Sequence, residues 1–343
     1  MLNLSGEAIF LKLPKIVLER TGKVKLSAVN GMMCTVCKRK EAFFFRSYSG
    51  EKLCKKCFTQ SIENKTRATI AKYKMLDFNN KIAVAVSGGK DSVSLLHVMV
   101  KIERDYPKAS LVAVSVDEGI RGYRDEAMKI AEENCRKLGV EHHIISFKEL
   151  YGFTLDEIVD NIKKKGTNEL TPCAYCGVLR RKALNVIARK VGANRLATAH
   201  TLDDEAQTIL LNMLHGDALR ITREKPVTDE NNPKLVRRVK PFCMIPEKET
   251  ALYAYAKKIE FQSVPCPYAS EAMRNDVRLF LNRMEEKHAG IKYTLFNTVE
   301  KMRQTLEKAT QPEKIKKCLL CGEPAAQTVC KACEMLQAIK TER

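Results

Sequence analysis

Residues 81–92 read KIAVAVSGGKDS, and this stretch decides the fold. The run Lys81–Val86 is apolar and rich in β-branched side chains, which predicts a buried parallel strand. A helix is predicted directly after the loop, and its apolar residues are Val93, Leu95, Leu96, Val98 and Met99. A glycine turn between a strand and a helix N-terminus lets backbone amides converge on an anion. The stretch therefore predicts a phosphate-binding loop.

The residue pattern of that loop indicates which kind of phosphate-binding loop it is. It is neither the GxxxxGK[ST] loop nor the GxGxxG fingerprint. It matches the SGGxDS loop of enzymes that cleave ATP between the α and β phosphates. The residues expected to hold the pyrophosphate are Ser87, Gly88, Gly89, Lys90, Asp91 and Ser92.

Further strands and helices alternate downstream, which predicts an α/β fold with a parallel sheet flanked by helices. Strands are expected at 111–116, 143–147 and 195–199. Ligands of such sheets sit beyond the carboxyl ends of the strands, where Asp117 and the segment 200–204 would lie. In the helix that follows, we expect a core-packed stripe formed by Ala206, Ile209, Leu210, Met213 and Leu214.

Eleven of the thirteen cysteines are arranged in a pattern. Without a secretory signal they do not suggest disulfides, because intracellular thiols stay reduced. Two outer sets, each made of two CxxC pairs, have the arrangement of a structural zinc site; their members are Cys34, Cys37, Cys54 and Cys57, and Cys318, Cys321, Cys330 and Cys333. Reactive redox pairs are the alternative, but neither set has a thioredoxin-like context. Cys135 and Cys243 lie in apolar segments and are expected to fill the core.

Charge and composition point to a nucleic-acid partner. The chain has 343 residues, a formal net charge of +19, 45% hydrophobic and 29% charged residues, which is typical of a globular protein of two or three domains. Residues 1–80 hold 16 Lys and Arg against 6 Asp and Glu. A basic end of this kind usually meets a polyanion, although a merely solvated surface is the plainer reading. No run is long and apolar enough to span a membrane, and we expect a cytoplasmic protein.

Taken together, the motifs VAVSGGKDS, VDEGIRGYRDEA, CAYCGVLRRKAL, HTLDDEAQTILLNMLHGD and CLLCGE…CKAC resemble the archaeal and eukaryotic tRNA 2-thiouridine synthetases. These are PP-loop ATP pyrophosphatases, and the resemblance covers roughly residues 32–335 in the same motif order. It implies zinc ribbons at both ends of the catalytic domain. It also implies ATP and Mg²⁺ as requirements and tRNA as the substrate.

The resemblance also assigns residues. It implies that the ATP-contacting positions are Ala85, Val86, Ser87, Asp91, Val116, Arg180 and Ala199, and that the catalytic polar residues are Asp91, Arg180 and Asp204. Some relatives have Lys at Arg180, and the family commonly has Gly-His-Asn where this chain has Ala199-His200-Thr201.

The resemblance further implies that Cys173, Cys176 and Cys266 match the three ligands of a 4Fe–4S cluster. Three thiolates leave one iron open for an exogenous sulfide. The spacing alone does not distinguish iron–sulfur from zinc, so a third zinc site completed by His200 or Asp203 stays open.

The implied reaction is thiolation of a tRNA uridine. O2 of the uridine attacks the α-phosphorus of ATP, pyrophosphate leaves, and a sulfide then displaces AMP from C2. The sulfur comes as free sulfide or from the thiocarboxylate of a ubiquitin-like carrier. The residues that make up these motifs favour wobble position 34 of the tRNA over position 54 as the site of thiolation.

Three rival functions remain. A GMP synthetase-like ligase leaves the cysteines without a purpose, and a cytidine 2-thiolase usually has two CxxC pairs in its catalytic domain. A non-enzymatic zinc-ribbon tRNA-binding protein is the third rival, but it gives the loop Ser87–Ser92 no purpose.

We expect five segments along the chain: an extension at 1–31, a zinc module at 32–75, the PP-loop domain with its iron–sulfur site at 76–270, a helical segment at 271–312 and a second zinc module at 313–343. The extension has no counterpart in the family pattern. We expect the chain to form a homodimer.

Overall fold

The computed structural model describes residues 31–165, 170–228, 232–268, 273–309 and 315–340. The predicted extension therefore lies almost wholly outside the described residues. The strands are β1 (Phe44–Arg46), β2 (Glu51–Leu53), β3 (Lys81–Ala85), β4 (Ser110–Asp117), β5 (His142–Ser146), β6 (Arg195–Ala197), β7 (Arg237–Val239), β8 (Lys316–Lys317) and β9 (Pro324–Ala325). The helices are α2 (Lys55–Lys72), α3 (Lys90–Glu103), α4 (Arg124–Leu138), α5 (Phe147–Tyr151), α6 (Leu155–Lys165), α7 (Pro172–Lys190), α8 (Leu202–Leu214), α9 (Ala218–Arg223), α10 (Glu247–Lys257), α11 (Met273–Lys287), α12 (Ile291–Ala309) and α13 (Lys331–Lys340).

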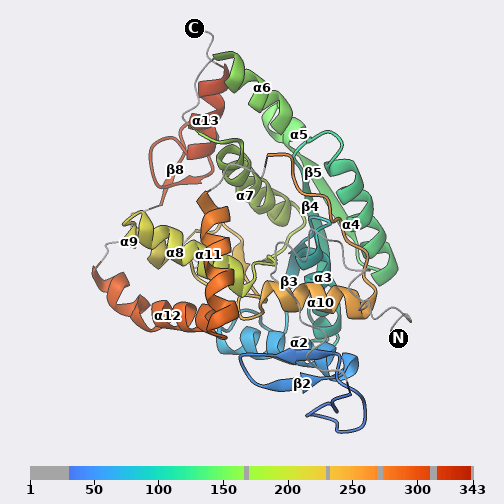
Figure 1. Cartoon of the computed structure of the whole chain (residues 1–343). Coiled ribbons are helices and arrows are strands. Elements are labelled where there is room, and N and C mark those ends of the chain that lie inside the picture. The colour runs from blue at the N-terminus through green and yellow to red at the C-terminus, as the bar shows by residue number, and fades with distance from the viewer. Residues whose placement is uncertain (1–30, 166–169, 229–231, 269–272, 310–314, 341–343) are drawn as a thin grey trace.

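A parallel sheet in the order β5-β4-β3-β6-β7 forms the centre of the molecule (Figure 1). The chain builds outward from β3 through β4 to β5 and then crosses to β6 on the other side of β3. In open α/β sheets, ligands bind at such a point of reversal, outside the carboxyl ends of the strands. The predicted α/β class and the central role of residues 81–85 are confirmed.

Alternation along the strands divides the core into two layers, because successive side chains of a strand point to opposite faces. Ile82 and Val84 pack on one face with the apolar residues of α2, α3 and α10. Ala83 and Val114 pack on the other face with those of α6, α7 and α13. The predicted apolar residues of α3 are all buried, as are Cys135 and Cys243.

The predicted stripe on α8 is wrong at its far end. Met213 and Leu214 are 42% and 59% exposed, whereas Ala206 and Ile209 are buried. The buried face of α8 instead includes the polar side chains of Asp203, Glu205, Gln207 and Asn212. Periodicity placed the stripe on the apolar side chains, but α8 presents a mixed polar face to α9, α11 and α12, so its last turn leaves the core.

The two outer cysteine sets lie at opposite ends of the molecule (Figure 1). The N-terminal set is tied to α10 by a buried ion pair, in which Arg46 donates to both carboxylate oxygens of Glu249 at 3.0 and 2.8 Å. The C-terminal set rests on α7, where Arg189 donates to both oxygens of Glu323 at 3.0 and 2.7 Å. In the described ranges, no helix has the length and apolar character needed to cross a bilayer.

Candidate functional site

A cavity of about 620 Å³ opens beyond the carboxyl ends of β3, β4 and β6. Ten of the residues singled out from the sequence line it: Ala85, Val86, Ser87, Gly89, Asp91, Ser92, Val116, Arg180, Ala199 and Asp204. They come from the loop after β3, the end of β4, α7 and the start of α8. Residues up to 119 positions apart in the chain therefore face one space, as the strand-end argument predicted.

Gly88 and Lys90 do not line the cavity but shape the loop. Gly88 has φ of +82°, and a Cβ there would lie 2.2 Å from the carbonyl oxygen of Ala127. Its own carbonyl oxygen accepts a hydrogen bond from the backbone N–H of Gln262 at 2.9 Å. Only glycine fits this approach, because a side chain would meet rigid backbone. The hydroxyl of Ser92 closes the turn by accepting from the backbone N–H of Ser87 at 3.0 Å.

Asp91 is held in place by charged and polar neighbours. Lys90 Nζ lies 2.7 Å from Asp91 Oδ2 and 2.7 Å from Glu247 Oε1, and the Thr250 hydroxyl donates to Asp91 Oδ1. Burial disfavours the charge on Lys90, yet the two carboxylates raise the pKa of Lys90 above its usual range. Burial raises the pKa of Asp91, and Lys90 and Thr250 oppose that shift. The first turn of α3 thus presents a fixed carboxylate beside the free amides of the helix N-terminus.

Glu118 connects the loop to the cysteine side of the cavity. It is 4% exposed and pairs through Oε2 with Arg124 Nε and through Oε1 with Arg180 Nε, both at 2.7 Å. Arg124 donates to the carbonyl oxygens of Ser87 at 3.1 Å and Val116 at 2.6 Å. The sequence interpretation missed Glu118 and Arg124, although both follow the end of β4, where the strand-end rule could have found them.

Asp204 lines the cavity and also caps the N-terminus of α8. Its Oδ2 accepts from the backbone N–H and the hydroxyl of Thr201, both at 2.8 Å, which forms a capping box at the start of α8. Burial would raise its pKa, but His200, Arg274 and the Thr201 hydrogen bonds lower the pKa of Asp204 instead. The carboxylate therefore stays ionised beside the loop.

Asp203 faces away from the chemistry. Its Oδ1 pairs with Lys292, and its Oδ2 accepts from the backbone N–H of Glu247 at 2.7 Å. Both oxygens are thus engaged in packing α8 against α10 and α12. The alternative in which Asp203 completes a third zinc site finds no available ligand atom.

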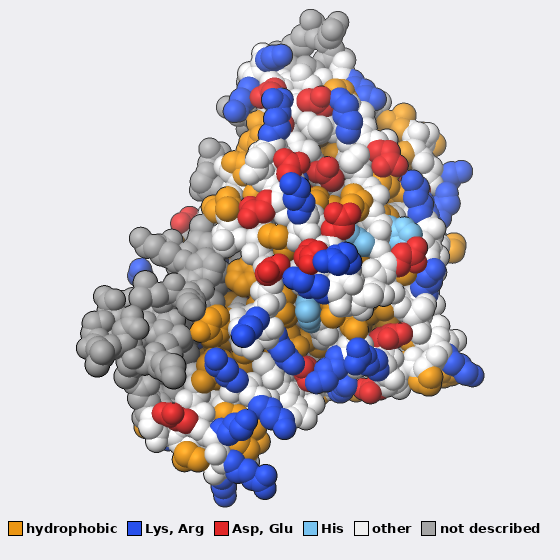
Figure 2. Space-filling model, turned by 90° about the vertical axis from the view of Figure 1, so that its right-hand side faces the viewer, with side chains coloured by type: hydrophobic (Ala, Val, Ile, Leu, Met, Phe, Trp, Pro, Cys, Tyr) orange, Lys and Arg blue, Asp and Glu red, His pale blue; other side chains and the backbone are white. Residues whose placement is uncertain are grey.

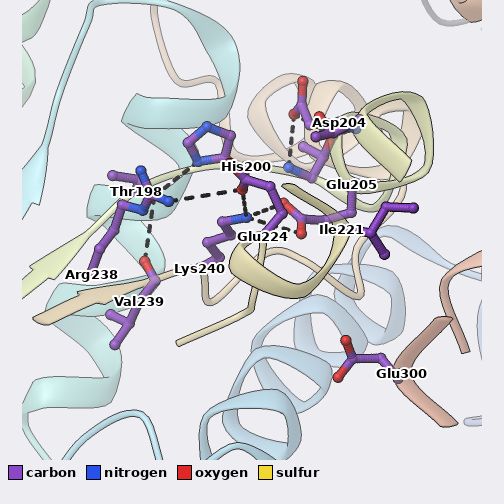
Figure 3. Close-up of polar contacts among 12 residues, drawn as sticks. Thr198, His200, Asp204, Glu205, Ile221, Glu224, Arg238, Val239, Lys240 and Glu300 are labelled. Atoms are coloured by element: carbon purple, nitrogen blue, oxygen red, sulfur yellow. Dashed lines mark hydrogen bonds and ion pairs between the residues drawn. The ribbon is translucent and has the colours of Figure 1, made fainter. Parts of the chain in front are cut away.

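A second charged network lies at the β6–β7 side of the cavity (Figure 3). Lys240 is buried, and its Nζ lies 2.8 Å from Glu205 Oε1 and 3.0 Å from Glu224 Oε2. Figure 3 shows Arg238 reaching from β7 toward Glu224, beside His200 and Thr198. His200 Nδ1 lies 2.9 Å from the Thr198 hydroxyl. The quoted motifs contain His200 and Glu205 but not Glu224, Arg238 and Lys240, which lie just after α9 and in or after β7, so the sequence did not reveal this network.

The inner cysteines cluster around the start of α7. Thr171 caps this helix, so Cys173 and Cys176 are its second and fifth residues, three positions apart on one face. Arg180 donates to the Cys176 sulfur at 2.7 Å, and Cys173 Sγ lies 3.2 Å from the Tyr268 carbonyl oxygen. Cys266 is half-buried against the same apolar cluster as Cys176. In the described part of the chain, these three sulfurs do not come as close together as those of the outer sets.

Each outer set brings four sulfur atoms within 4.8 Å of one another. Cys37 Sγ lies 3.9 Å from Cys54 Sγ, and Cys321 Sγ lies 3.7 Å from Cys330 Sγ. Four thiolates around one zinc ion, with bonds of about 2.3 Å, stand at about this spacing. Burial opposes ionisation, yet backbone N–H groups of Val36, Cys37 and Cys54 lower the pKa of Cys34 to about 6. The geometry fits a tetrahedral ion at each end.

Comparison with known proteins shows which family the chain resembles. The PP-loop domain family matches residues 58–285. The chain is 37% identical over 311 residues to cytoplasmic tRNA 2-thiolation protein 1 of Chlamydomonas reinhardtii, covering 90% of this chain and 85% of that protein. The Saccharomyces cerevisiae protein of the same name is 32% identical over 337 residues, covering 96% of this chain and 91% of the other.

A solved structure agrees with these relatives. The U34-tRNA thiolase NcsA from Methanococcus maripaludis, determined with its [4Fe-4S] cluster, is 32% identical in sequence and superposes with a TM-score of 0.77. The match covers 91% of this chain and 98% of that one. The predicted family resemblance is confirmed.

Proposed function

The chain belongs to the PP-loop family of tRNA 2-thiolation proteins, and we propose that it converts a tRNA uridine at wobble position 34 to 2-thiouridine in the cytoplasm. The observation that supports this function is a chain of hydrogen bonds and ion pairs. It runs from Ser87 through Arg124, Glu118 and Arg180 to Cys176. It joins a phosphate-type loop to a cysteine site across one cavity. A nucleic-acid binder without catalytic activity has no use for such a connection.

ATP occupies the inner part of the cavity. Its phosphates lie against the loop Ser87–Ser92 and the first amides of α3, where the helix N-terminus favours an anion. The apolar wall formed by Val114, Val116 and Leu196 suits the adenine ring. Asp91 and Asp204 are the carboxylates that would hold Mg²⁺, which would offset the negative charge of the phosphates.

The first step is adenylation of the base. O2 of the uridine attacks the α-phosphorus, the bond to the bridging oxygen breaks, and pyrophosphate leaves toward the loop. Arg180 reaches the cavity from α7 and stabilises the negative charge that develops on the α-phosphate. Glu118 raises the pKa of Arg180 and fixes the direction of its guanidinium group.

The second step replaces oxygen by sulfur. A sulfide attacks C2, and the C2–O2 bond breaks as AMP leaves with the former O2. A 4Fe–4S cluster held by Cys173, Cys176 and Cys266 would supply an open iron that keeps the sulfide close to the base. A cluster of four irons is larger than a single ion, which agrees with the wider spacing of these three sulfurs than of the outer sets. The sulfur comes as free sulfide or from a thiocarboxylated ubiquitin-like carrier.

The two outer sets each hold a structural Zn²⁺, since four thiolates leave no open position for water. We also propose a homodimer, supported by Leu279 and Phe280 of α11, each of which is 54% exposed. Sedimentation of the full chain tests this point directly.

The activity is tested by incubating anaerobically purified, cluster-loaded protein with ATP, sulfide and tRNA. Mass spectrometry of the digested tRNA should show 2-thiouridine at position 34, with AMP and pyrophosphate formed in equal amounts. Asp91→Asn should remove both products while tRNA still binds. Thiolated tRNA without AMP would refute the proposed chemistry, and thiouridine at position 54 would refute the proposed position.

A further inference from the structure

Arg181 lines the cavity without an acidic partner. Its neighbour Arg180 pairs with Glu118, but no carboxylate of the described residues lies within 4.0 Å of the Arg181 guanidinium. Partial desolvation inside the cavity and the positive charges of Arg238, Arg180 and Arg220 lower the pKa of Arg181, while Glu224 acts in the opposite sense. The side chain of Arg181 is exposed on the cavity wall, so an anion that enters the cavity can pair with it without displacing a protein carboxylate.

Arg238 completes the same wall from β7. Its Nε is buried and has no hydrogen-bond acceptor among the described residues. Its Nη2 approaches Glu224 Oε2 only to 3.8 Å, while the same oxygen lies 3.0 Å from Lys240 Nζ. Figure 3 shows this arrangement, with Lys240 turned toward Glu205 and Glu224 and Arg238 on the side of His200.

The carboxylates around the cavity therefore offset only part of the positive charge of its Lys and Arg side chains. Lys240 is matched by two carboxylates, and Arg124 and Arg180 share Glu118. Arg238 on β7 lies 3.8 Å from Glu224, which Lys240 already contacts, and Arg181 on α7 has no carboxylate within 4.0 Å among the described residues, so this side of the cavity carries an excess positive charge. The phosphate loop follows β3, and β6 separates that strand from β7. The excess charge thus stands apart from the part of the cavity assigned to the phosphates of ATP.

We propose that Arg181 and Arg238 form a subsite for a backbone phosphodiester of the tRNA, next to the target uridine. This inference rests on the proposed function and extends it to the way the substrate is held. Guanidinium groups bind phosphate oxygens in pairs of parallel hydrogen bonds, which fixes orientation as well as position. Anchoring the flanking phosphate on this wall leaves the base free to turn toward the loop, where its O2 meets the α-phosphate of ATP.

The probe is a stem-loop RNA that carries the target uridine. A second version has neutral methylphosphonates at the linkages on both sides of that uridine. Affinity is measured at several salt concentrations for the wild-type full chain, Arg181→Gln and Arg238→Gln. Arg136→Gln is the matched control, because it removes an exposed arginine of α4 that pairs with Glu133.

Each cavity variant should bind the natural stem-loop about tenfold more weakly, as expected for a lost charged hydrogen bond. The salt slope should fall by about 0.7 per lost contact, the value for single-stranded nucleic acid. On the neutral-linkage RNA, the wild type and the two variants should bind alike. The affinity for ATP should not change, and Arg136→Gln should behave as the wild type on both RNAs.

Three results would overturn the subsite. One is unchanged RNA affinity in both variants. Another is a loss of ATP affinity without a loss of RNA affinity, which would assign the two arginines to the nucleotide phosphates. The third is an equal defect on natural and neutral-linkage RNA, which would mean a diffuse electrostatic effect. Failure of the wild-type protein to make 2-thiouridine, with the RNA results intact, would refute the activity but leave the subsite standing.

Discussion

At the scale of single residues, Gly88 is the most constrained position of the site. An added methyl group would overlap the Ala127 backbone, and the positive φ disfavours any L side chain. Gly88→Ala should lower the free energy of unfolding by about 3 kcal/mol and abolish ATP binding. Calorimetric titration with ATP and urea denaturation measure the two effects.

Gly139 supplies the control for this prediction. It also has a positive φ, +67°, but no atom lies within 4 Å of the position that a Cβ would take. Gly139→Ala should cost about 1 kcal/mol and leave ATP binding intact. If Gly88→Ala bound ATP as tightly as Gly139→Ala, the close approach of loop and α4 would not matter for the nucleotide.

The second prediction at the scale of residues concerns Lys240 and the way stability depends on pH. Burial raises the pKa of Glu205, and Lys240 opposes this shift, while Lys240 and Arg238 hold the pKa of Glu224 at about 2 against burial. Lys240→Met leaves the buried Glu205 carboxylate without its cation, which should cost about 3 kcal/mol at pH 7. Its pKa then rises further above the unfolded value, so protonation relieves the cost at lower pH.

The destabilisation by Lys240→Met should therefore shrink as the pH falls from 7 to 5. Urea denaturation of both proteins at each pH measures the difference. A Lys240→Met deficit that is constant or grows with acidity would show that Glu205 is not the group left uncompensated.

At the scale of elements, α7 connects the cavity with the inner cysteines and the C-terminal cysteine set. Its first five residues include Cys173 and Cys176, its next turn faces the cavity through Arg180, and its far half supports the C-terminal cysteine set through Arg189. Lys182 Nζ lies 3.2 Å from Cys321 Sγ. One helix therefore fixes the positions of two inner cysteines, Arg180 and the C-terminal cysteine set relative to one another.

Replacing any one of Cys173, Cys176 and Cys266 by Ala should remove the brown colour and the thiolation activity. Bound zinc should stay near two per chain, because the outer sets keep their four thiolates each. Metal analysis and the visible spectrum of anaerobic protein give the two readings. A fall in zinc content by about a third would instead make the inner site a zinc site.

Local pattern was sufficient for some elements and not for others. The strand, loop and helix at 81–103 follow from contiguous residues, since a buried strand and a glycine turn leave strong local signals. The apolar end of α8 misled, because Met213 and Leu214 have the right spacing but no neighbour to bury them. Arg181 and Arg238 could not be paired from sequence, because the wall they form depends on how β7 packs beside β6.

At the scale of the whole molecule, basic side chains gather at the N-terminal cysteine module. On the face shown in Figure 2, Lys and Arg predominate at the lower end, whereas both signs mix above it. Five cations that flank the cysteines there are exposed: Lys38, Arg39, Lys40, Lys55 and Lys56. A metal ion bound by the four cysteines would fix this module as one rigid unit, and Arg46 with Glu249 holds it on α10.

Changing these five residues to Gln should weaken tRNA binding and flatten its dependence on salt, by about one unit of slope or somewhat less for each lost phosphate contact. ATP affinity and the cluster colour should not change. Binding curves at several salt concentrations decide the matter. The same affinity and slope in the five-fold variant would show that this end serves solubility only and that tRNA docks elsewhere.

The central claim is that ATP activates the uridine by taking up its O2. The most direct test follows that oxygen atom, using tRNA whose target uridine carries a heavy oxygen isotope at C2. After a single turnover with cluster-loaded protein, ATP and sulfide, mass spectrometry should find the heavy oxygen in the phosphate of AMP and none in water. Heavy oxygen in water, or in pyrophosphate, would contradict the account.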